Sequence, residues 1–450
     1  MSNNQYSKEL KGRRKIYTDY DFVTDENVIE ILNDSLIDHE LNRADIIFLL
    51  DFESGVQPLV RDKVVYPDID INANLNLASQ ITEFNLGYFW GNPFAIVQKS
   101  DKLPAGSKSI VDNSAIAELN NMYYAENKDS KDQELARYVE ICGIGYQMID
   151  IKRNYDDGDS VFDLVSLNPL YTFVVHSKNV RREVLLGVTY SVNKNGARTF
   201  TCISKDKVYI INEQKQITNG QSKTKLNNYQ FGDRSGEMNP LGEVYIIEYE
   251  RSFDRTGCFE HQVDDMNAMN VLQSDLVNDV AQNTQAIWWG NNFEFEKDKD
   301  GNQLGVQSGQ WIMTKSTGGG EKPDIKPLVL QYDYEGVLRN IQAKHDYILE
   351  NAYVPKQSDP GGGSTTSAMS LSSGWSATEA VACKKFLVLK KSFQLRNKLA
   401  LKAIKKSPYI EPDNEMLKLS ANDIEVRPIR QKTFNLTEKV NSLATMLNCM

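Results

Sequence analysis

The stretch Leu86-Gly-Tyr-Phe-Trp-Gly-Asn-Pro-Phe94 marks an abrupt change of local structure. Before and into it, apolar side chains recur at helical spacing from Asn72 to Phe89. Pro93 has no amide hydrogen and disfavours the helical conformation at Asn92, so the helix cannot continue through this point. The chain then turns into the apolar run Phe94 to Val97. The sequence therefore predicts a helix that stops at Gly91.

Working outward, helical and strand-rich segments separate along the chain. Helical spacing predicts a helix from Glu26 to Phe52 and another that enters at Leu135. The latter meets Gly143-Ile-Gly145, which lacks the third glycine of a dinucleotide site and is interpreted as a close-packed turn from helix to strand. Between residues 150 and 250, short β-branched or aromatic runs separated by turn signals predict an antiparallel meander. The fold class is therefore α+β.

Three long helices are predicted in the second half of the chain. They cover Glu260 to Trp289, Tyr334 to Tyr353 and Thr378 to Lys405. At ~1.5 Å per residue the first would reach about 45 Å, more than a small domain needs. We interpret the Trp288-Trp289 pair at its end as an anchor into neighbouring protein, with base stacking as the alternative. Residues 291–327, between the first two helices, have the composition of short strands and turns.

A Gly/Ser-rich stretch, Val354 to Trp375, separates the last two predicted helices. Three consecutive glycines follow Pro360, and the hydroxyl residues beyond them supply no core. This composition predicts a long mobile loop. Loops of this length inside compact domains are usually functional.

The charge distribution is uneven. The formal net charge is −10, which argues against high-affinity DNA binding because phosphate neutralisation is the main source of such affinity. Nine basic residues nevertheless lie between Lys384 and Lys406 without an acid. A solvated helix face would mix both signs, so the run indicates an anionic neighbour. DNA and an acidic surface of an adjacent subunit both remain open.

Signatures of catalysis and cofactor binding are missing from the sequence. It contains no phosphate-binding loop, no GxSxG and no HExxH, and its four histidines are scattered. Asp298 to Asn302 resembles the start of a calcium loop, but Gln303 and Gly309 replace its required glycine and acid. The five cysteines lack CxxC spacing, which is typical of a reducing compartment, and no apolar run is long enough for a membrane span. We expect no catalytic residue, no metal and no cofactor.

The order of these parts resembles the portal proteins of tailed bacteriophages, in particular the branch common in long-tailed phages of Gram-positive hosts. The resemblance covers Glu26 to Leu447. It is carried by four features, which are the Leu86–Phe94 motif, Gly143-Ile-Gly-Tyr146, Leu167-Asn-Pro-Leu-Tyr-Thr-Phe173, and the order helix, insert, helix, loop, helix after Glu260. Two departures are a Gly-Gly-Gly-Ser tract in the loop and a short carboxyl-terminal segment.

The resemblance implies a non-enzymatic protein that forms a ring of about twelve subunits, with head-to-tail interfaces. Such a ring occupies one capsid vertex of the virion, after assembly in the host cytoplasm, and passes double-stranded DNA during packaging and ejection. Its implied partners are the terminase large subunit, a head-completion or adaptor protein, and the major capsid and scaffolding proteins, with no membrane.

Each part of the chain receives a place by this resemblance. The expected division is a flexible amino-terminal arm (1–25), a wing of helices and sheet (26–266), stem helix 1 (267–290), a clip (291–327), stem helix 2 (328–353), a tunnel loop (354–376), the long wing helix with a returning strand (377–435) and the start of a helical crown (436–450).

Candidate site residues follow from the same placement. Those of the tunnel loop, expected to contact DNA, are Lys356, Gly361, Gly362, Gly363, Ser364, Thr365, Thr366 and Ser367. The channel-lining candidates are Asp333, Glu335, Asp346 and Glu350, whose charge would repel phosphates and let DNA slide. The clip candidates for docking of terminase and connector are Phe293, Phe295, Trp311 and Met313. Contacts to a subunit or to DNA are expected from Lys384, Lys385, Lys390 and Lys391.

Two other classes stay open at this point. One is a metal-dependent enzyme that processes nucleic acid, which requires carboxylates converging in one cleft. The other is a capsid scaffold or adaptor without a channel. The mass of the purified particle and end-on images would separate all three.

Overall fold

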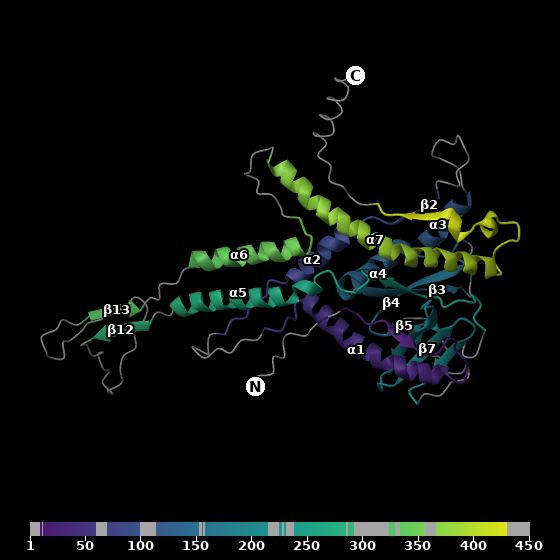
Figure 1. The fold of residues 1–450 in the computed structure, drawn as a ribbon, viewed down its shortest axis with the longest axis horizontal. Helices are drawn as coiled ribbons and strands as arrows, with labels where there is room; N and C mark the ends of the chain where they lie inside the picture. Colours follow the sequence, from purple (N-terminus) through teal and green to yellow (C-terminus); the bar gives the residue numbers. More distant parts are fainter. Residues whose placement is uncertain are drawn as a thin grey trace, which may run out of the picture. The chain divides into compact units, whose positions relative to one another are not determined.

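The computed structural model describes residues 10, 12–59, 70–99, 114–152, 155, 158–214, 225–226, 229–230, 238–284, 287–291, 324–328, 334–355 and 366–429. Within them the chain divides into two compact units. Unit 1 comprises residues 1–57, 76–264 and 349–450, and unit 2 comprises residues 58–75 and 265–348. Both helices and sheets are present, which confirms the α+β class (Figure 1).

Most helices differ from the sequence predictions at their ends, and the helix over Ser114–Ala125 was not predicted. The helices are α1 (Val28–Ser54), α2 (Leu77–Asn85) continued by a π-helical turn (Leu86–Trp90), α3 (Ser114–Ala125), α4 (Lys128–Cys142), α5 (Val263–Thr284), α6 (Tyr334–Asn351) and α7 (Thr366–Lys406). Short 3₁₀ turns cover Glu260–Gln262, Glu415–Lys418 and Ala421–Asp423. The helix expected from Asn72 begins only at Leu77 and ends at the predicted motif.

The strands form five small sheets. They are β1 (Ile16–Thr18), β2 (Ala95–Gln98), β3 (Ile144–Ile151), β4 (Phe162–Leu167), β5 (Thr172–Ser177), β6 (Val184–Val192), β7 (Arg198–Ser204), β8 (Val208–Ile211), β9 (Lys225–Leu226), β10 (Tyr229–Gln230), β11 (Ile246–Glu250), β12 (Ile287–Asn291), β13 (Asp324–Leu328) and β14 (Ile424–Arg427). The sheet orders are β1-β5-β6-β7-β8, β11-β3-β4, β10-β9, β12-β13 and β14-β2.

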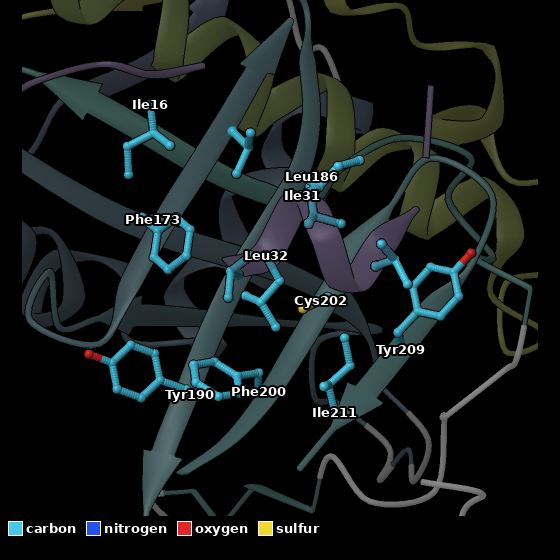
Figure 2. Packing of buried hydrophobic residues seen from close by; sticks show 13 residues of the cluster. Ile16, Ile31, Leu32, Phe173, Leu186, Tyr190, Phe200, Cys202, Tyr209 and Ile211 are labelled. Carbon is cyan, nitrogen blue, oxygen red and sulfur yellow. The ribbon is translucent and has the colours of Figure 1, made fainter. Parts of the chain in front are cut away.

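The predicted meander is correct for β5 to β8, which pair antiparallel in sequence order. The flanking runs that form β4 and β11 instead pair with β3 in a second, three-stranded sheet. Thirteen buried residues from α1, β1 and the first sheet form one core cluster, in which Ile31 and Leu32 of α1 lie over Phe173 and Leu186 (Figure 2). The core thus fixes the amino-terminal half of α1 to the sheet.

The expectation of a flexible arm over residues 1–25 is wrong from Gly12 onward. β1 pairs in parallel with β5, with Ile16 opposite Val175. Arg13 Nη2 lies 2.5 Å from Glu260 Oε1, with both side chains buried. The arm is fixed because β1 pairs with a strand that lies more than 150 positions away in the sequence, and this pairing satisfies backbone hydrogen bonds of the arm. Local sequence does not reveal so distant a partner.

The helix predicted over Glu260 to Trp289 is also shorter than expected. α5 ends at Thr284, and Trp288 and Trp289 lie in β12, opposite Pro327 and Lys326 of β13. The Ile287-Trp288-Trp289 run has high strand propensity, and the pairing with β13 decides its conformation. The two tryptophans are therefore not the end of a helix.

The close-packed turn predicted at Gly143-Ile-Gly145 is confirmed. Gly143 ends α4 with φ of 78°, and a Cβ there would lie 2.3 Å from the Arg255 carbonyl oxygen. A Cβ at Gly145 would lie 2.7 Å from Leu135 Cδ1. Gly143 therefore allows a close approach to the backbone of Arg255, and Gly145 allows β3 to lie close to α4.

Candidate functional site

The long helix α7 carries the basic run singled out in the sequence, and it packs against β3, β11 and β14 within unit 1. It begins at Thr366, twelve residues before the predicted start, so the loop prediction is wrong for residues 366–375. No proline occurs between Pro360 and Pro408, and a single glycine such as Gly374 costs a helix only about 1 kcal/mol, which packing can offset. Thr366 and Ser367 are therefore helical, not loop residues.

A side-chain hydrogen bond links α7 to the residues that follow α6. The hydroxyl of Thr378 donates to the carbonyl of Tyr353 at 2.8 Å, and Thr378 is buried. Trp375 lies against Tyr88 of the π-helical turn, with ring centroids 5.3 Å apart. These contacts therefore hold α7 to the end of α6 and to the Leu86–Phe94 motif.

Lys385, expected to contact DNA or another subunit, is instead an internal residue. Its Nζ lies 2.6 Å from Glu140 Oε1 and 4.1 Å from the centre of the Phe89 ring. Glu140, on α4, also accepts from Trp90 Nε1 at 2.8 Å and from Arg251 Nε at 2.9 Å. Burial opposes the charge of Glu140, but the attraction of Lys385 and Arg251 lowers its pKa to about 2. A buried carboxylate needs these donors, which accounts for a lysine pointing inward.

Aromatic side chains of the Leu86–Phe94 motif and of α7 pack beside the Lys385–Glu140 ion pair. Phe94 of the motif packs edge-on to Trp90, with centroids 5.2 Å apart, and lies 4.8 Å from the Phe393 ring of α7. The motif therefore joins α4 to α7 through one aromatic cluster and one buried carboxylate. The packing of its aromatic residues explains why the Leu86–Phe94 motif is distinctive in the sequence.

A second buried ion pair lies further along α7. Arg396 Nη1 is 2.6 Å from Asp132 Oδ1, and the Arg396 side chain is fully buried. Burial opposes the charge of the guanidinium, yet the attraction of Asp132 raises its pKa. Asp132 also accepts from Gln147 Nε2 of β3 at 3.1 Å. The pair fixes α7 to α4 and to the three-stranded sheet.

The remaining basic residues of α7 divide into two groups. Lys398 and Lys402 both lie 2.6 Å from Glu243 Oε1. The other five have no ion-pair partner within the described part of the chain, and they are Lys384, Lys390, Lys391, Lys405 and Lys406. Of the nine basic residues, four therefore pair with acids of the same chain and five are exposed or partly exposed without such a partner among the described residues.

Unit 2 contains the two helices predicted to form the stem. Glu335 of α6 is exposed and pairs with Arg339 at 3.3 Å, and Asp346 lies 3.5 Å from His345. At 100° per residue, Glu335, Asp346 and Glu350 share one face of α6, opposite the buried Ile341 and Ile348. Asp333 lies outside the described residues. The structure therefore places three of the four channel-lining candidates on one face of α6.

A feature of unit 2 that sequence reasoning missed is an extended segment along α5. Asn278 exchanges hydrogen bonds with the backbone of Ile71, its Oδ1 accepting at 2.9 Å and its Nδ2 donating at 2.8 Å. Ser274 Oγ accepts from the Ala73 amide at 2.9 Å, and Asn270 Oδ1 accepts from the Leu75 amide at 3.2 Å.

The spacing of these contacts explains the fit. Four helical residues rise about 6 Å and two extended residues about 6.6 Å, so every second amide meets every fourth side chain. The Asn-x-x-x-Ser-x-x-x-Asn spacing in α5 was the available signal.

Other expected site residues cannot be placed. The tunnel-loop residues Lys356, Gly361, Gly362, Gly363, Ser364 and Thr365 lie outside the described residues, as do the clip residues Phe293, Phe295, Trp311 and Met313 and the crown segment 436–450. Among the described residues, no group of three or more His, Cys, Asp or Glu side chains could hold a metal ion. No described helix is long and apolar enough to cross a bilayer.

Comparison with known proteins gives one match. The family described as phage portal protein, SPP1 Gp6-like, matches residues 65–448, which include the π-helical motif, both helices of unit 2 and α7. A search of curated proteins finds no match. Since the family matches most of the chain, this protein belongs to the SPP1 Gp6-like portal proteins of tailed bacteriophages, whose role is in DNA packaging and head-to-tail connection.

Proposed function

We propose that this chain forms a closed ring, of about twelve copies, that surrounds a channel for double-stranded DNA at one capsid vertex. The observation that carries the proposal is the family match over a chain in which α5, the β12-β13 pair and α6 form a unit separate from the wing. Long helices outside the main core are expected where neighbouring subunits supply part of the packing.

The parts of the chain receive distinct roles in this proposal. Unit 1 acts as the wing, with the crown starting after residue 435. α5 and α6 act as the stem, and residues 291–327 act as the clip that docks the terminase large subunit and later the adaptor protein. The acids Glu335, Asp346 and Glu350, with Asp333, line the channel, where like charge repels the phosphates and prevents trapping of the duplex.

The tunnel loop is restricted by the early start of α7. Lys356, Gly361, Gly362, Gly363, Ser364 and Thr365 are its proposed DNA-contacting residues, and Thr366 and Ser367 form the first turn of the helix that follows. The Tyr353–Thr378 contact holds the base of this segment, so displacement by a moving duplex would stop at α6 and α7.

Purified protein should form a closed particle of about twelve subunits with a central hole in negative-stain images. A stable monomer or dimer would contradict the proposal. Metal-dependent turnover of nucleic acid by that species would favour the enzyme, and a compact particle without a hole would favour a scaffold or adaptor. The family is a structural one, which favours the portal over the enzyme.

A further inference from the structure

Helix α1 is apolar on two faces, although only one of them is buried within the chain. Val28, Ile31, Leu32, Ile46 and Leu49 are fully buried. On the opposite side, Ile37 is 68% exposed and Leu41 is 45% exposed. Neighbouring exposed apolar side chains on one helix face often mark a contact surface, which makes the outer face of α1 a candidate for one.

The outer face of α1 is also acidic. Asp34 and Asp38 lie beside Ile37 and Leu41 at helical spacing, and Asp34 is exposed. Neither aspartate has an ion-pair partner within the described residues. Across all of α1 there are seven acids and one basic residue, Arg43, which pairs with Glu40 at 3.2 Å. A partner for this face must therefore be apolar and basic.

Helix α7 presents a face of that kind. Leu387 is 69% exposed and stands between Lys384 and Lys391, which are both exposed. The three residues are spaced at i, i+3 and i+7. On α1, Asp34, Ile37, Asp38 and Leu41 alternate an acid with an apolar residue at i, i+3, i+4 and i+7. Each helix thus offers exposed apolar side chains beside charges of one sign, and the signs are opposite.

Both faces belong to unit 1 but to different parts of it. α1 packs against α4 and β1, and α7 packs against β3 and β11. The exposures of Ile37 and Leu387 show that neither side chain is covered within the described part of the chain. Two different, complementary faces on one subunit generate head-to-tail contacts, which close into a ring when the rotation permits.

We propose that the outer face of α1 (Asp34, Ile37, Asp38 and Leu41) docks on the outer face of α7 (Lys384, Leu387 and Lys391) of a second copy of this chain. The proposal rests on the ring function proposed above. It assigns the unpaired lysines at the centre of α7 to contact between subunits, with DNA contact as the alternative.

The test uses charge exchange in the full-length chain. Asp34→Lys/Asp38→Lys and Lys384→Glu/Lys391→Glu should each raise the concentration needed for half-maximal ring assembly at least about tenfold, since like charges would then face one another. Combining all four substitutions should restore assembly to within about threefold of the unmodified protein. Ring content is read by mass photometry at several salt concentrations.

A matched control for the lysine variant carries the same change of charge elsewhere. Lys194→Glu/Lys205→Glu alters two exposed lysines at turns of the first sheet and should assemble like the unmodified protein. Rings from every reversed variant, or a fourfold variant that is worse than either parent, would overturn the interface. Normal rings combined with loss of DNA retention in Lys384→Glu/Lys391→Glu would assign these lysines to DNA instead. If the unmodified protein forms no ring, the proposed function itself fails.

Discussion

Thr378 donates a hydrogen bond to the carbonyl oxygen of Tyr353 across 2.8 Å, although 25 positions separate the two residues in the sequence. Tyr353 adopts a left-handed conformation with φ of 58°, and its amide donates to the Glu350 carbonyl, which ends α6. The contact therefore joins the end of one long helix to the fourth turn of the next. Between the two residues lie the proposed tunnel loop and the first three turns of α7.

Removing the Thr378 hydroxyl should loosen this junction. Thr378→Val keeps the shape but leaves the Tyr353 carbonyl without this donor, and we expect a loss of about 1 kcal/mol in the free energy of unfolding. Thr378→Ser retains the donor and is the matched control. Urea titration checks the stability, and faster amide exchange at Val354 checks the location. Equal stability of the valine and serine variants would contradict the assigned role.

Lys385 should matter for folding rather than for DNA. Lys385→Met removes one partner of a buried ion pair, which costs about 3–5 kcal/mol because Glu140 keeps its charge in an apolar surrounding. Lys405→Met removes the same charge from an exposed site of α7 and should change stability by less than about 0.5 kcal/mol. Denaturant unfolding of both variants checks the difference. Normal stability combined with defective assembly in Lys385→Met would return this residue to the set of intersubunit contacts.

His39 should make folding sensitive to mild acid. It stacks on Phe173, with ring centroids 4.4 Å apart, and burial lowers its pKa to about 4. Between pH ~6.5 and ~4 the unfolded chain binds a proton that the folded chain rejects, so stability is complete above pH ~6.5 and falls as the pH drops. We expect a loss of about 2 kcal/mol between pH 6.5 and 5 from this group.

The pH effect is checked by urea titrations of the unmodified protein and His39→Gln. The glutamine variant should show a shallower dependence over this pH range, whatever its absolute stability. Parallel curves for the two proteins would mean that another group causes the acid sensitivity.

The glycine tract should be needed for DNA movement rather than for assembly. Alanine at Gly361, Gly362 and Gly363 favours helix by about 1 kcal/mol per residue, which would extend α7 toward its amino terminus. We expect normal rings and reduced packaging. Serine at the same positions is a milder control because serine is small and polar and favours helix less than alanine does. Packaging equal to that of the unmodified protein in the alanine variant would contradict the role of the loop.

Sequence periodicity predicts those elements whose cause is local. α1, α4, α6 and the β5–β8 meander follow from apolar spacing and turn residues, and Gly143 from its need for a left-handed conformation. Elements fixed by distant partners are not predictable in this way. β1 depends on β5, β12 on β13, and the extended residues 71–75 on polar side chains of α5.

The same distinction between local causes and distant partners applies to the candidate site. The basic run of α7 is visible in the sequence, but only the fold separates Lys385 and Arg396, which pair with acids of α4, from the outward lysines. Counting the charges along a helix does not show which of them are exposed. Burial decides which charges can contact a partner.

The mass and end-on appearance of the purified, unmodified protein test the central claim most directly. The account predicts one closed particle of about twelve subunits with a central hole. A homogeneous monomer or dimer at micromolar concentration and low salt would contradict it.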